Sequence, residues 1–342
     1  MKVIFHKLFA NLKKNNKKTQ KHCRSSGLKA FGTIVMLFSV LMLCMPVATA
    51  EAEGEVAGEV VDYYYLNTGK EVNKSIKKLI DDSMWTDHSS QDYTLKEIRL
   101  TTEIPEGANY YNTAHLTDGY NGNNITAYVD YETKILYYWR GTYDQLPTDS
   151  VSKTAPIRLN EDSSYMFNQF EELTSIDLSE IDFSEAINMS KMFYGDSKLT
   201  TITFPSSVNT KKLNDASYMF ESCDSLSSVN LSNFDLSHVT TMAGMFESSS
   251  VTNVRIGNHK SVELTDISSM FSDCFNLSQV DLNGLVTDNV TNMSELFRRC
   301  SNLTKVNLDL INTQNVTNFY EMFYECSKLT DLNISNFKTH NA

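Results

Sequence analysis

A unit of about 26 residues recurs seven times in the second half of the chain, and this repetition restricts the fold more than any other feature. Its clearest mark is the dipeptide Met-Phe, which becomes Leu-Phe in the sixth copy. The phenylalanines stand 26, 27, 26, 25, 26 and 26 residues apart, at Phe167, Phe193, Phe220, Phe246, Phe271, Phe297 and Phe323. In six of the seven copies, apolar residues also follow six, nine and eleven positions later. A unit this short cannot bury an apolar face alone, so the copies are predicted to stack.

Each copy is predicted to hold a short helix, a turn and a short strand. In the sixth copy, the apolar residues from Met293 to Cys300 follow the i, i+3, i+4, i+7 spacing of one helix face. Ile176 and Leu178 alternate with polar neighbours, which is the period of a half-buried strand. A residue type that caps helix N-termini stands five positions before every repeat phenylalanine. These capping positions are Asp162, Asn188, Asp215, Thr241, Asp266, Asn292 and Asn318.

Stacked copies of this kind predict an α/β solenoid of the leucine-rich-repeat type, with parallel strands on one face and short helices on the other. Residues 127–139 carry aromatic and β-branched residues on both sides of a polar turn, which predicts a β-hairpin. Because the hairpin comes just before the first copy, it is predicted to cap the N-terminal end of the stack.

The chain is predicted to have four parts. Residues 1–50 form a signal peptide, residues 51–90 a linker and a short helix, residues 91–161 an N-terminal capping region with the β-hairpin, and residues 162–342 the seven repeats of 25–27 residues. The short helix is expected within residues 71–84, where Val72, Ile76, Leu79 and Ile80 have helical spacing. The seventh copy stops at Ala342, so we expect either a chain truncated relative to longer relatives or one released without an anchor.

The first 50 residues have the order of a secretory signal peptide. A basic stretch precedes a mostly apolar run of 16 residues, Ala30–Met45, and the small residues Ala48, Thr49 and Ala50 follow. As a helix, this run rises about 24 Å, less than the roughly 30 Å of a bilayer core, which argues against the alternative of an uncleaved membrane anchor. The protein is therefore predicted to be secreted or displayed at the cell surface, with no membrane span after removal of the leader.

Charge is divided unevenly between this leader and the rest of the chain. The first 50 residues hold nine of the 30 Lys and Arg residues and no Asp or Glu, so residues 51–342 carry 21 basic and 42 acidic residues. Their net charge of −21 repels phosphate groups, which argues against nucleic acid and anionic lipid as partners.

The third copy carries the repeat pattern almost whole, from Met219-Phe220-Glu221-Ser222-Cys223 to Val239-Thr240-Thr241-Met242. The pattern MFxxCxxLxxVxLSxFDxSxVTxM, followed over residues 162–342, resembles the 26-residue repeat of BspA-type bacterial surface proteins. This resemblance implies a secreted or surface-displayed leucine-rich-repeat protein, in a family associated with adhesion to host proteins and other cells. It implies no catalytic residue. The second and fourth copies depart from the pattern at residues 203–205 and 255–260.

Four cysteines follow the leader, at Cys223, Cys274, Cys300 and Cys326. Each comes three residues after a repeat phenylalanine, in phase with the apolar face, so each is expected to be a small buried hydrophobe. A disulfide between Cys274 and Cys300, or between Cys300 and Cys326, is the alternative. No Cys/His cluster has the spacing of metal ligands, and we predict no metal, no cofactor and no catalytic residue.

The outward face of the predicted parallel sheet is the candidate ligand surface, because its polar side chains alternate with buried ones along each strand. The candidate residues are Asp177, Asn230, Arg255, Asp281, Asn283, Asn307, Asp309 and Asn333. Two interpretations stay open: a wide hydrogen-bonding surface for a protein or glycan, or a solvated face whose Asn and Asp side chains bond to one another. Binding hot spots are rich in Trp, Tyr and Arg, and Arg255 is the one such residue here. We therefore expect modest affinity per site, amplified by repetition at a surface.

The leading hypothesis is a non-enzymatic adhesion module that binds a host extracellular protein, a glycan or a neighbouring cell through this face. The alternative is a purely structural envelope or spacer protein without a specific ligand. A third hypothesis, an enzyme with its site within residues 63–150, would require titratable groups that converge in a cleft.

Overall fold

The computed structural model describes residues 64–82, 95–108, 113–117, 124–130, 132–141, 145–147, 155–256, 262–282 and 284–342. The contacts divide the chain into Met1–Val60 and Val61–Ala342, and all described residues lie in the second unit. The predicted signal peptide lies outside the described residues.

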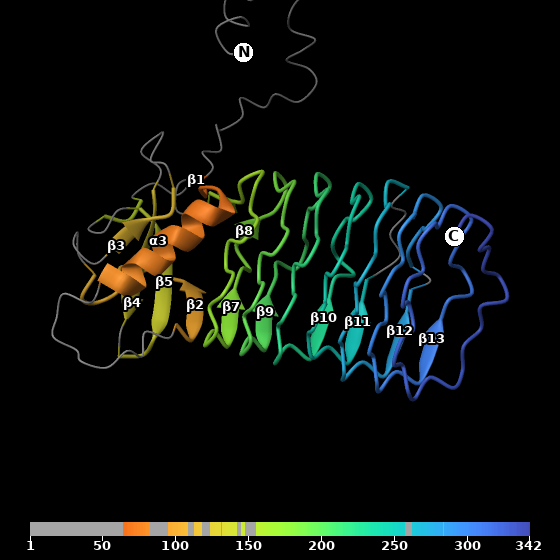
Figure 1. Cartoon of the computed structure of the whole chain (residues 1–342). Helices are drawn as coiled ribbons and strands as arrows, with labels where there is room; N and C mark the ends of the chain where they lie inside the picture. Colours follow the sequence, from red (N-terminus) through yellow and green to blue (C-terminus); the bar gives the residue numbers. More distant parts are fainter. Residues whose placement is uncertain are drawn as a thin grey trace, which may run out of the picture. The chain divides into compact units, whose positions relative to one another are not determined.

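Short strands are the main regular elements among the described residues, and α3, Gly69–Asp82, is the one helix there (Figure 1). The strands are β1 (Tyr64–Tyr65), β2 (Glu97–Leu100), β3 (Thr113–His115), β4 (Ile125–Asp130), β5 (Ile135–Arg140), β6 (Ile157–Arg158), β7 (Ser175–Asp177), β8 (Ile181–Asp182), β9 (Thr201–Thr203), β10 (Ser228–Asn230), β11 (Asn253–Arg255), β12 (Gln279–Asp281) and β13 (Lys305–Asn307). They form a six-stranded sheet in the order β3-β4-β5-β2-β7-β9, a three-stranded sheet β1-β6-β8, and the pairs β10-β11 and β12-β13. In this part of the chain, no helix combines the length and the hydrophobicity that crossing a bilayer requires.

Successive copies lie side by side in chain order, joined by a ladder of single parallel bridges. The ladder links the predicted capping positions Asp162, Asn188, Asp215, Thr241, Asp266, Asn292 and Asn318. Strands β7 and β9 to β13 form a second parallel ladder, one strand per copy. Its pairing is interrupted between β9 and β10 and between β11 and β12.

The predicted helix in each copy is wrong, because the segment around the Met-Phe dipeptide forms two consecutive turns. The residues two before and two after each phenylalanine have φ between 52° and 75°, outside the right-handed helical region. These pairs are Tyr165 and Gln169, Lys191 and Gly195, Tyr218 and Ser222, Gly244 and Ser248, Ser269 and Asp273, Glu295 and Arg299, and Glu321 and Glu325. We call these seven stretches the turn segments.

Hydrogen bonds between copies explain the turn segments. The N–H of Phe220 donates to the Met245 carbonyl at 2.9 Å, and the N–H of Ser222 donates to the Glu247 carbonyl at 2.8 Å. A helix would use these N–H groups inside its own copy, whereas the turns leave them for the next copy. Two four-residue turns give the same inward spacing as a helix, so the hydrophobic period alone could not distinguish them.

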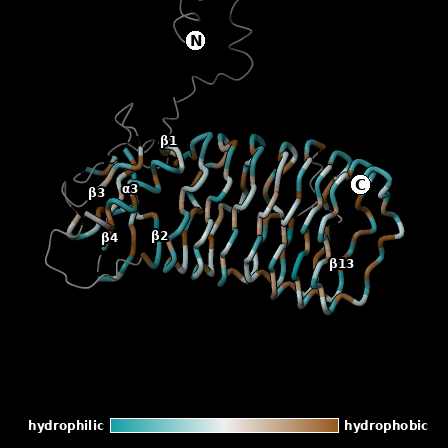
Figure 2. The backbone as a smooth tube through the Cα atoms, viewed as in Figure 1, coloured by the Kyte–Doolittle hydropathy of each residue, from teal (hydrophilic) through white to brown (hydrophobic). Residues whose placement is uncertain are grey.

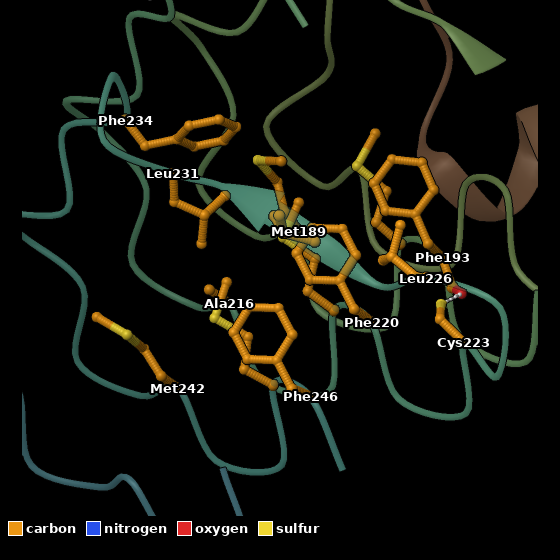
Figure 3. Close-up of a cluster of buried hydrophobic side chains, with 14 of the residues drawn as sticks. Met189, Phe193, Ala216, Phe220, Cys223, Leu226, Leu231, Phe234, Met242 and Phe246 are labelled. Carbon is orange, nitrogen blue, oxygen red and sulfur yellow. Dashed lines mark hydrogen bonds between the residues drawn. The ribbon is translucent and has the colours of Figure 1, made fainter. Parts of the chain in front are cut away.

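The repeat phenylalanines form one continuous stack in the core. Six successive ring pairs have centroids 5.4–5.7 Å apart and interplanar angles of 3–19°. Figure 3 shows Phe193, Phe220 and Phe246 in this stack, with other apolar side chains around them. Hydrophobic and hydrophilic residues alternate at short intervals along each copy, so every copy contributes to both the core and the surface (Figure 2). Each stacked pair of phenylalanine rings contributes about 0.5–1.5 kcal/mol to stability beyond the effect of its buried area.

The four cysteines in the described part of the chain are free, and three of them are buried, as predicted. The Cys223 thiol donates to the carbonyl of Phe193 in the preceding copy at 3.2 Å (dashed line in Figure 3), and Cys274, Cys300 and Cys326 make the same contact. Burial raises the pKa of Cys274 to about 12, so this thiol stays protonated at neutral pH. The disulfides considered as the alternative are not formed.

The predicted capping residues do cap a backbone end, although the structure that follows is a turn. The side-chain Oδ1 of Asn188 accepts the N–H of Ser190 at 2.9 Å, and that of Asp215 accepts the N–H of Ser217 at 2.9 Å. This is the hydrogen bond of an Asx-turn, which satisfies an N–H group just as an N-cap would. The hydrogen-bonding role of these capping positions was therefore predicted correctly, but a turn follows them in place of the predicted helix.

The region before the repeats adds strands to the sheets of the repeats. The predicted hairpin is confirmed as the antiparallel pair β4 and β5. Strand β2 lies between β5 and β7 and is parallel to both, so it continues the strand ladder by one position. Strand β1 pairs in parallel with β6, which pairs with β8 of the first copy.

Helix α3 covers the first copy, and its position confirms the helix predicted within residues 71–84. Val72 and Ile76 are buried in the core. The Gly69 N–H donates to the Asp162 carbonyl at 2.8 Å, and Asn73 Nδ2 donates to the Asn168 carbonyl at 3.1 Å. A Cβ at Gly69 would lie 2.2 Å from a backbone oxygen, so only glycine permits this close approach.

Candidate functional site

The outward side chains of the strand ladder form the candidate surface, which we call the strip. It comprises the first and third residues of β7 and of β9 to β13, together with Asp309, Asp331 and Asn333. In β10, β11 and β12, these two residues are exposed and the middle valine is buried. Each valine fixes its strand in the core, so the two outward positions recur at every copy.

Seven of the eight predicted surface residues are described, and Asn283 lies outside the described residues. Asn230, Arg255, Asp281, Asp309 and Asn333 are exposed, and Asp177 and Asn307 are half-buried. Strand pairing brings Asn230 beside Arg255, and Asp281 beside Asn307. Arg255 and Asp281 are not joined in this way, because β11 and β12 do not pair.

Four of the predicted residues have structural tasks of their own. The Oδ1 atoms of Asp177, Asn230, Asn307 and Asn333 each accept a backbone N–H two residues later, at 2.9, 3.1, 3.3 and 3.1 Å. In addition, Asn333 Nδ2 donates to Asp309 Oδ1 at 3.3 Å, which is the bonding between neighbouring Asn and Asp side chains considered as an alternative. These side chains end their strands in Asx-turns, so part of the strip is explained by the fold alone.

The centre of the strip is different, because its side chains are not committed. Ser228, Asn253, Arg255 and Gln279 are exposed, and none of them makes a side-chain hydrogen bond or ion pair with another described residue. We call these four residues the strip centre. They offer hydroxyl, amide and guanidinium groups to solvent from three strands, β10, β11 and β12.

Outward residues beside the single-bridge ladder behave in the opposite way. Thr265, Thr291 and Thr317 stand one residue before bridge positions, and each hydroxyl donates to a carbonyl of the preceding copy at 3.0–3.4 Å. Asn289 and Asn315 donate their side-chain amides to carbonyls of the preceding copy at 2.6 and 2.7 Å. On this surface, the polar side chains form hydrogen bonds that join neighbouring copies.

A second group of exposed residues was not predicted from the sequence and lies on and beside the turn segments of the last three copies. Phe275, Tyr320 and Tyr324 are 47%, 62% and 46% exposed. Arg298 bonds Glu321 at 2.8 Å and Asp273 at 3.2 Å, and Arg299 bonds Asp273 at 2.7 Å. The sequence signal was the Arg-Arg pair with nearby tyrosines, residue types common in binding hot spots. Their side chains are already paired with their own neighbours, which leaves the strip centre as the less committed surface.

The turn segments of the second to fourth copies hold a further charged cluster. Lys191 Nζ lies 4.8 Å from the ring centroids of both Tyr194 and Tyr218, and 3.7 Å from Glu221 Oε2. Burial and, after it, the nearby carboxylates led by Glu221 raise the pKa of Glu247 to about 7, and Lys191 acts in the opposite direction. Among the described residues, no group of three or more His, Cys, Asp or Glu side chains could hold a metal ion.

A family model described as "Mycoplasma protein of unknown function, DUF285" matches residues 161–280 and 252–342. The two matches together span residues 161–342, more than half of the chain and all seven copies. No curated protein and no solved structure matches the chain.

Proposed function

Because the chain belongs to the DUF285 family, a repeat-type family related to BspA-like surface repeat proteins, we propose that it is a non-enzymatic module that binds an extracellular ligand through the strip. In this proposal the copies are leucine-rich-repeat-type coils of a solenoid, and the leader exports the protein to the cell surface or the medium. The ligand is a host extracellular protein, a glycan or a component of a neighbouring cell.

The observation that carries the proposal is the uncommitted strip centre. Elsewhere on the described surface, recurring Thr and Asn side chains bond the preceding copy, and they add to stacking. At Asn253, Arg255 and Gln279, the polar groups have no such role. Exposed polar groups on a rigid, repeated scaffold are suited to a wide, water-mediated contact with a partner.

A spacer without a ligand is the second candidate, and the Asx-turns of Asp177, Asn230, Asn307 and Asn333 favour it. If all strip residues served only to end strands, the face would need no partner. The two candidates differ in one respect that can be measured, since a spacer has no saturable ligand.

The test is a binding screen of the purified protein against immobilised host extracellular proteins, glycans and whole cells. The strip variant carries Asn253→Ala, Arg255→Ala and Gln279→Ala. The control variant carries Glu185→Ala and Lys212→Ala, which removes an exposed ion pair outside the strip. We expect saturable binding that weakens at least about tenfold in the strip variant and is unchanged in the control, with similar melting temperatures for all three proteins.

Equal binding by the strip variant and the wild type would contradict the proposal. A complete absence of saturable binding across the screen would favour the spacer.

A further inference from the structure

We propose that the strip binds an extended, uncharged polysaccharide whose sugar rings run along the strand ladder, one ring per copy. The inference rests on the proposed function and names the ligand class of the same surface. Three properties of the strip lead to it: the chemistry of its side chains, its period and its charge.

The side chains of the strip centre match the hydroxyl groups of a sugar. Asn253 and Gln279 each present an amide with donors and an acceptor in one plane, and Arg255 presents a planar fork of donors. Vicinal hydroxyls of a pyranose ring can bond such a plane through two atoms at once. The buried valines between these residues hold them at fixed positions along the ladder.

The period of the strip selects among linear polymers. Paired strands lie about 4.8 Å apart, so equivalent side chains recur at that distance along the ladder. A β-1,4-linked chain of pyranose rings advances by nearly the same distance per ring and stays in step with the copies. An extended peptide advances only about 3.3 Å per residue and falls out of step within a few residues.

The two interruptions of the ladder divide the strip into stretches. The last stretch runs from β12 through β13 to Asp331, because Lys305 bridges Asp331 in parallel. Within such a stretch the register is uninterrupted, and a polymer can make equivalent contacts in successive copies. Contacts therefore accumulate with chain length within each stretch.

Charge excludes anionic polymers from the ligand class. Asp281, Asp309 and Asp331 outnumber Arg255 and Lys305 in the C-terminal half of the strip, and residues 51–342 as a whole carry a net charge of −21. Uronic and sialic acid polymers are repelled by such a surface. No described residue of the strip is aromatic, so no sugar ring can stack on an aromatic side chain there, and each sugar ring adds little binding free energy. High affinity therefore requires a long polysaccharide chain.

The experiment measures binding of the purified protein to cello-oligosaccharides of two to six rings. Maltohexaose is the matched control, since it has the composition of cellohexaose but an α-linkage that coils the chain. Polygalacturonate is the anionic control. We expect affinity to rise at least about tenfold from cellobiose to cellohexaose, with no binding of maltohexaose or polygalacturonate and loss of cellohexaose binding in the strip variant.

Three results would overturn the inference: no binding of cellohexaose, equal binding of cellohexaose and maltohexaose, or unchanged cellohexaose binding in the strip variant. Its failure can be separated from failure of the proposed function. If the strip variant loses binding to an extracellular protein or cell in the screen while no oligosaccharide binds, the strip is a ligand surface for another class of partner.

Discussion

At the scale of single residues, Asp196 is the clearest departure from the repeat. It occupies the cysteine position of the second copy and is fully buried. Its Oδ1 accepts the N–H of Phe170 at 2.8 Å, whereas its Oδ2 has no hydrogen-bond partner among the described residues. Burial raises the pKa of Asp196 well above its ordinary value, and the Phe170 N–H and Lys77 act in the opposite direction.

The sign of this shift predicts how stability depends on pH. Because the pKa of Asp196 is higher in the folded than in the unfolded chain, its contribution to stability is lost as pH rises from about 4 towards the folded pKa. Asp196→Asn keeps an acceptor for the Phe170 N–H and removes the charge. We expect it to raise the free energy of unfolding at pH 8, by up to about 1.4 kcal/mol per pH unit between the two pKa values, and to make little difference at pH 4.

Denaturant unfolding at a series of pH values measures this difference. Glu171→Gln is the control, because Glu171 is an exposed carboxylate of the neighbouring copy. If the difference in unfolding free energy between Asp196→Asn and the wild type did not vary with pH, the claim that burial raises the pKa of Asp196 would be contradicted.

Gly244 gives a second prediction for one residue. Its φ of +60° is shared by non-glycine residues at the same position of other copies, so backbone conformation alone does not require glycine. A Cβ there would lie 2.2 Å from two ring carbons of Tyr218. Gly244→Ala is therefore expected to cost about 1–3 kcal/mol, most of which disappears in the Tyr218→Ala background. Additive costs in a double-mutant cycle of unfolding free energies would show that the ring is not the cause.

At the scale of elements, the turn segments predict an effect with the opposite sign from a helix. Ser248 has a φ of 57°, so Ser248→Gly relieves the left-handed conformation and is expected to stabilise the protein by about 0.5–1 kcal/mol. In a helix the same change would destabilise by a similar amount. Ser227→Gly, at an exposed residue without positive φ, is the control and is expected to destabilise slightly. Chemical denaturation of the three proteins decides between a turn and a helix.

The turn segments also show where sequence reasoning reached its limit. The apolar spacing from Met293 to Cys300 correctly identified buried residues, and the column from Asp162 to Asn318 correctly identified capping chemistry. Both signals are local, whereas the choice of turn over helix depends on hydrogen bonds such as Phe297 N–H to the Met322 carbonyl, between residues of different copies. Strand β2, inserted between β5 and β7, was unpredictable for the same reason.

At the scale of the whole molecule, stability should depend on copies and their neighbours. Deleting residues 267–292 removes 26 residues and joins Asp266 to Met293. Because Asp266 and Asn292 are successive bridge positions, Asp266 takes the place of Asn292 and the phase of the ladder is kept. We expect a folded protein whose unfolding enthalpy near 60 °C is smaller by about 18 kcal/mol, the share of 26 residues. Deleting residues 267–279, half a copy, should instead prevent cooperative folding. Differential scanning calorimetry measures the unfolding enthalpy of both variants. Failure of the whole-copy deletion variant to fold would contradict the prediction that stability depends on each copy and its neighbours.

The candidate surface was only partly predictable from the sequence. Alternation along the strands located the strip, and the predicted exposure of Arg255 and Asp281 agrees with the structure. The sequence pattern did not predict which strand position has a committed side chain: Asn230, the third residue of β10, ends its strand, whereas Asn253, the first residue of β11, is uncommitted. That distinction depends on the backbone geometry after each strand.

The central claim is that the strip is the contact surface, and one comparison of affinities tests it most directly. A strip swap carries Arg255→Glu and Asp281→Lys, and a control swap carries Glu185→Lys and Lys212→Glu, so both keep the net charge of the wild type. Surface plasmon resonance against the strongest binder from the screen should show at least about tenfold weaker binding for the strip swap and no change for the control swap. Equal affinities for the strip swap and the wild type would contradict the claim.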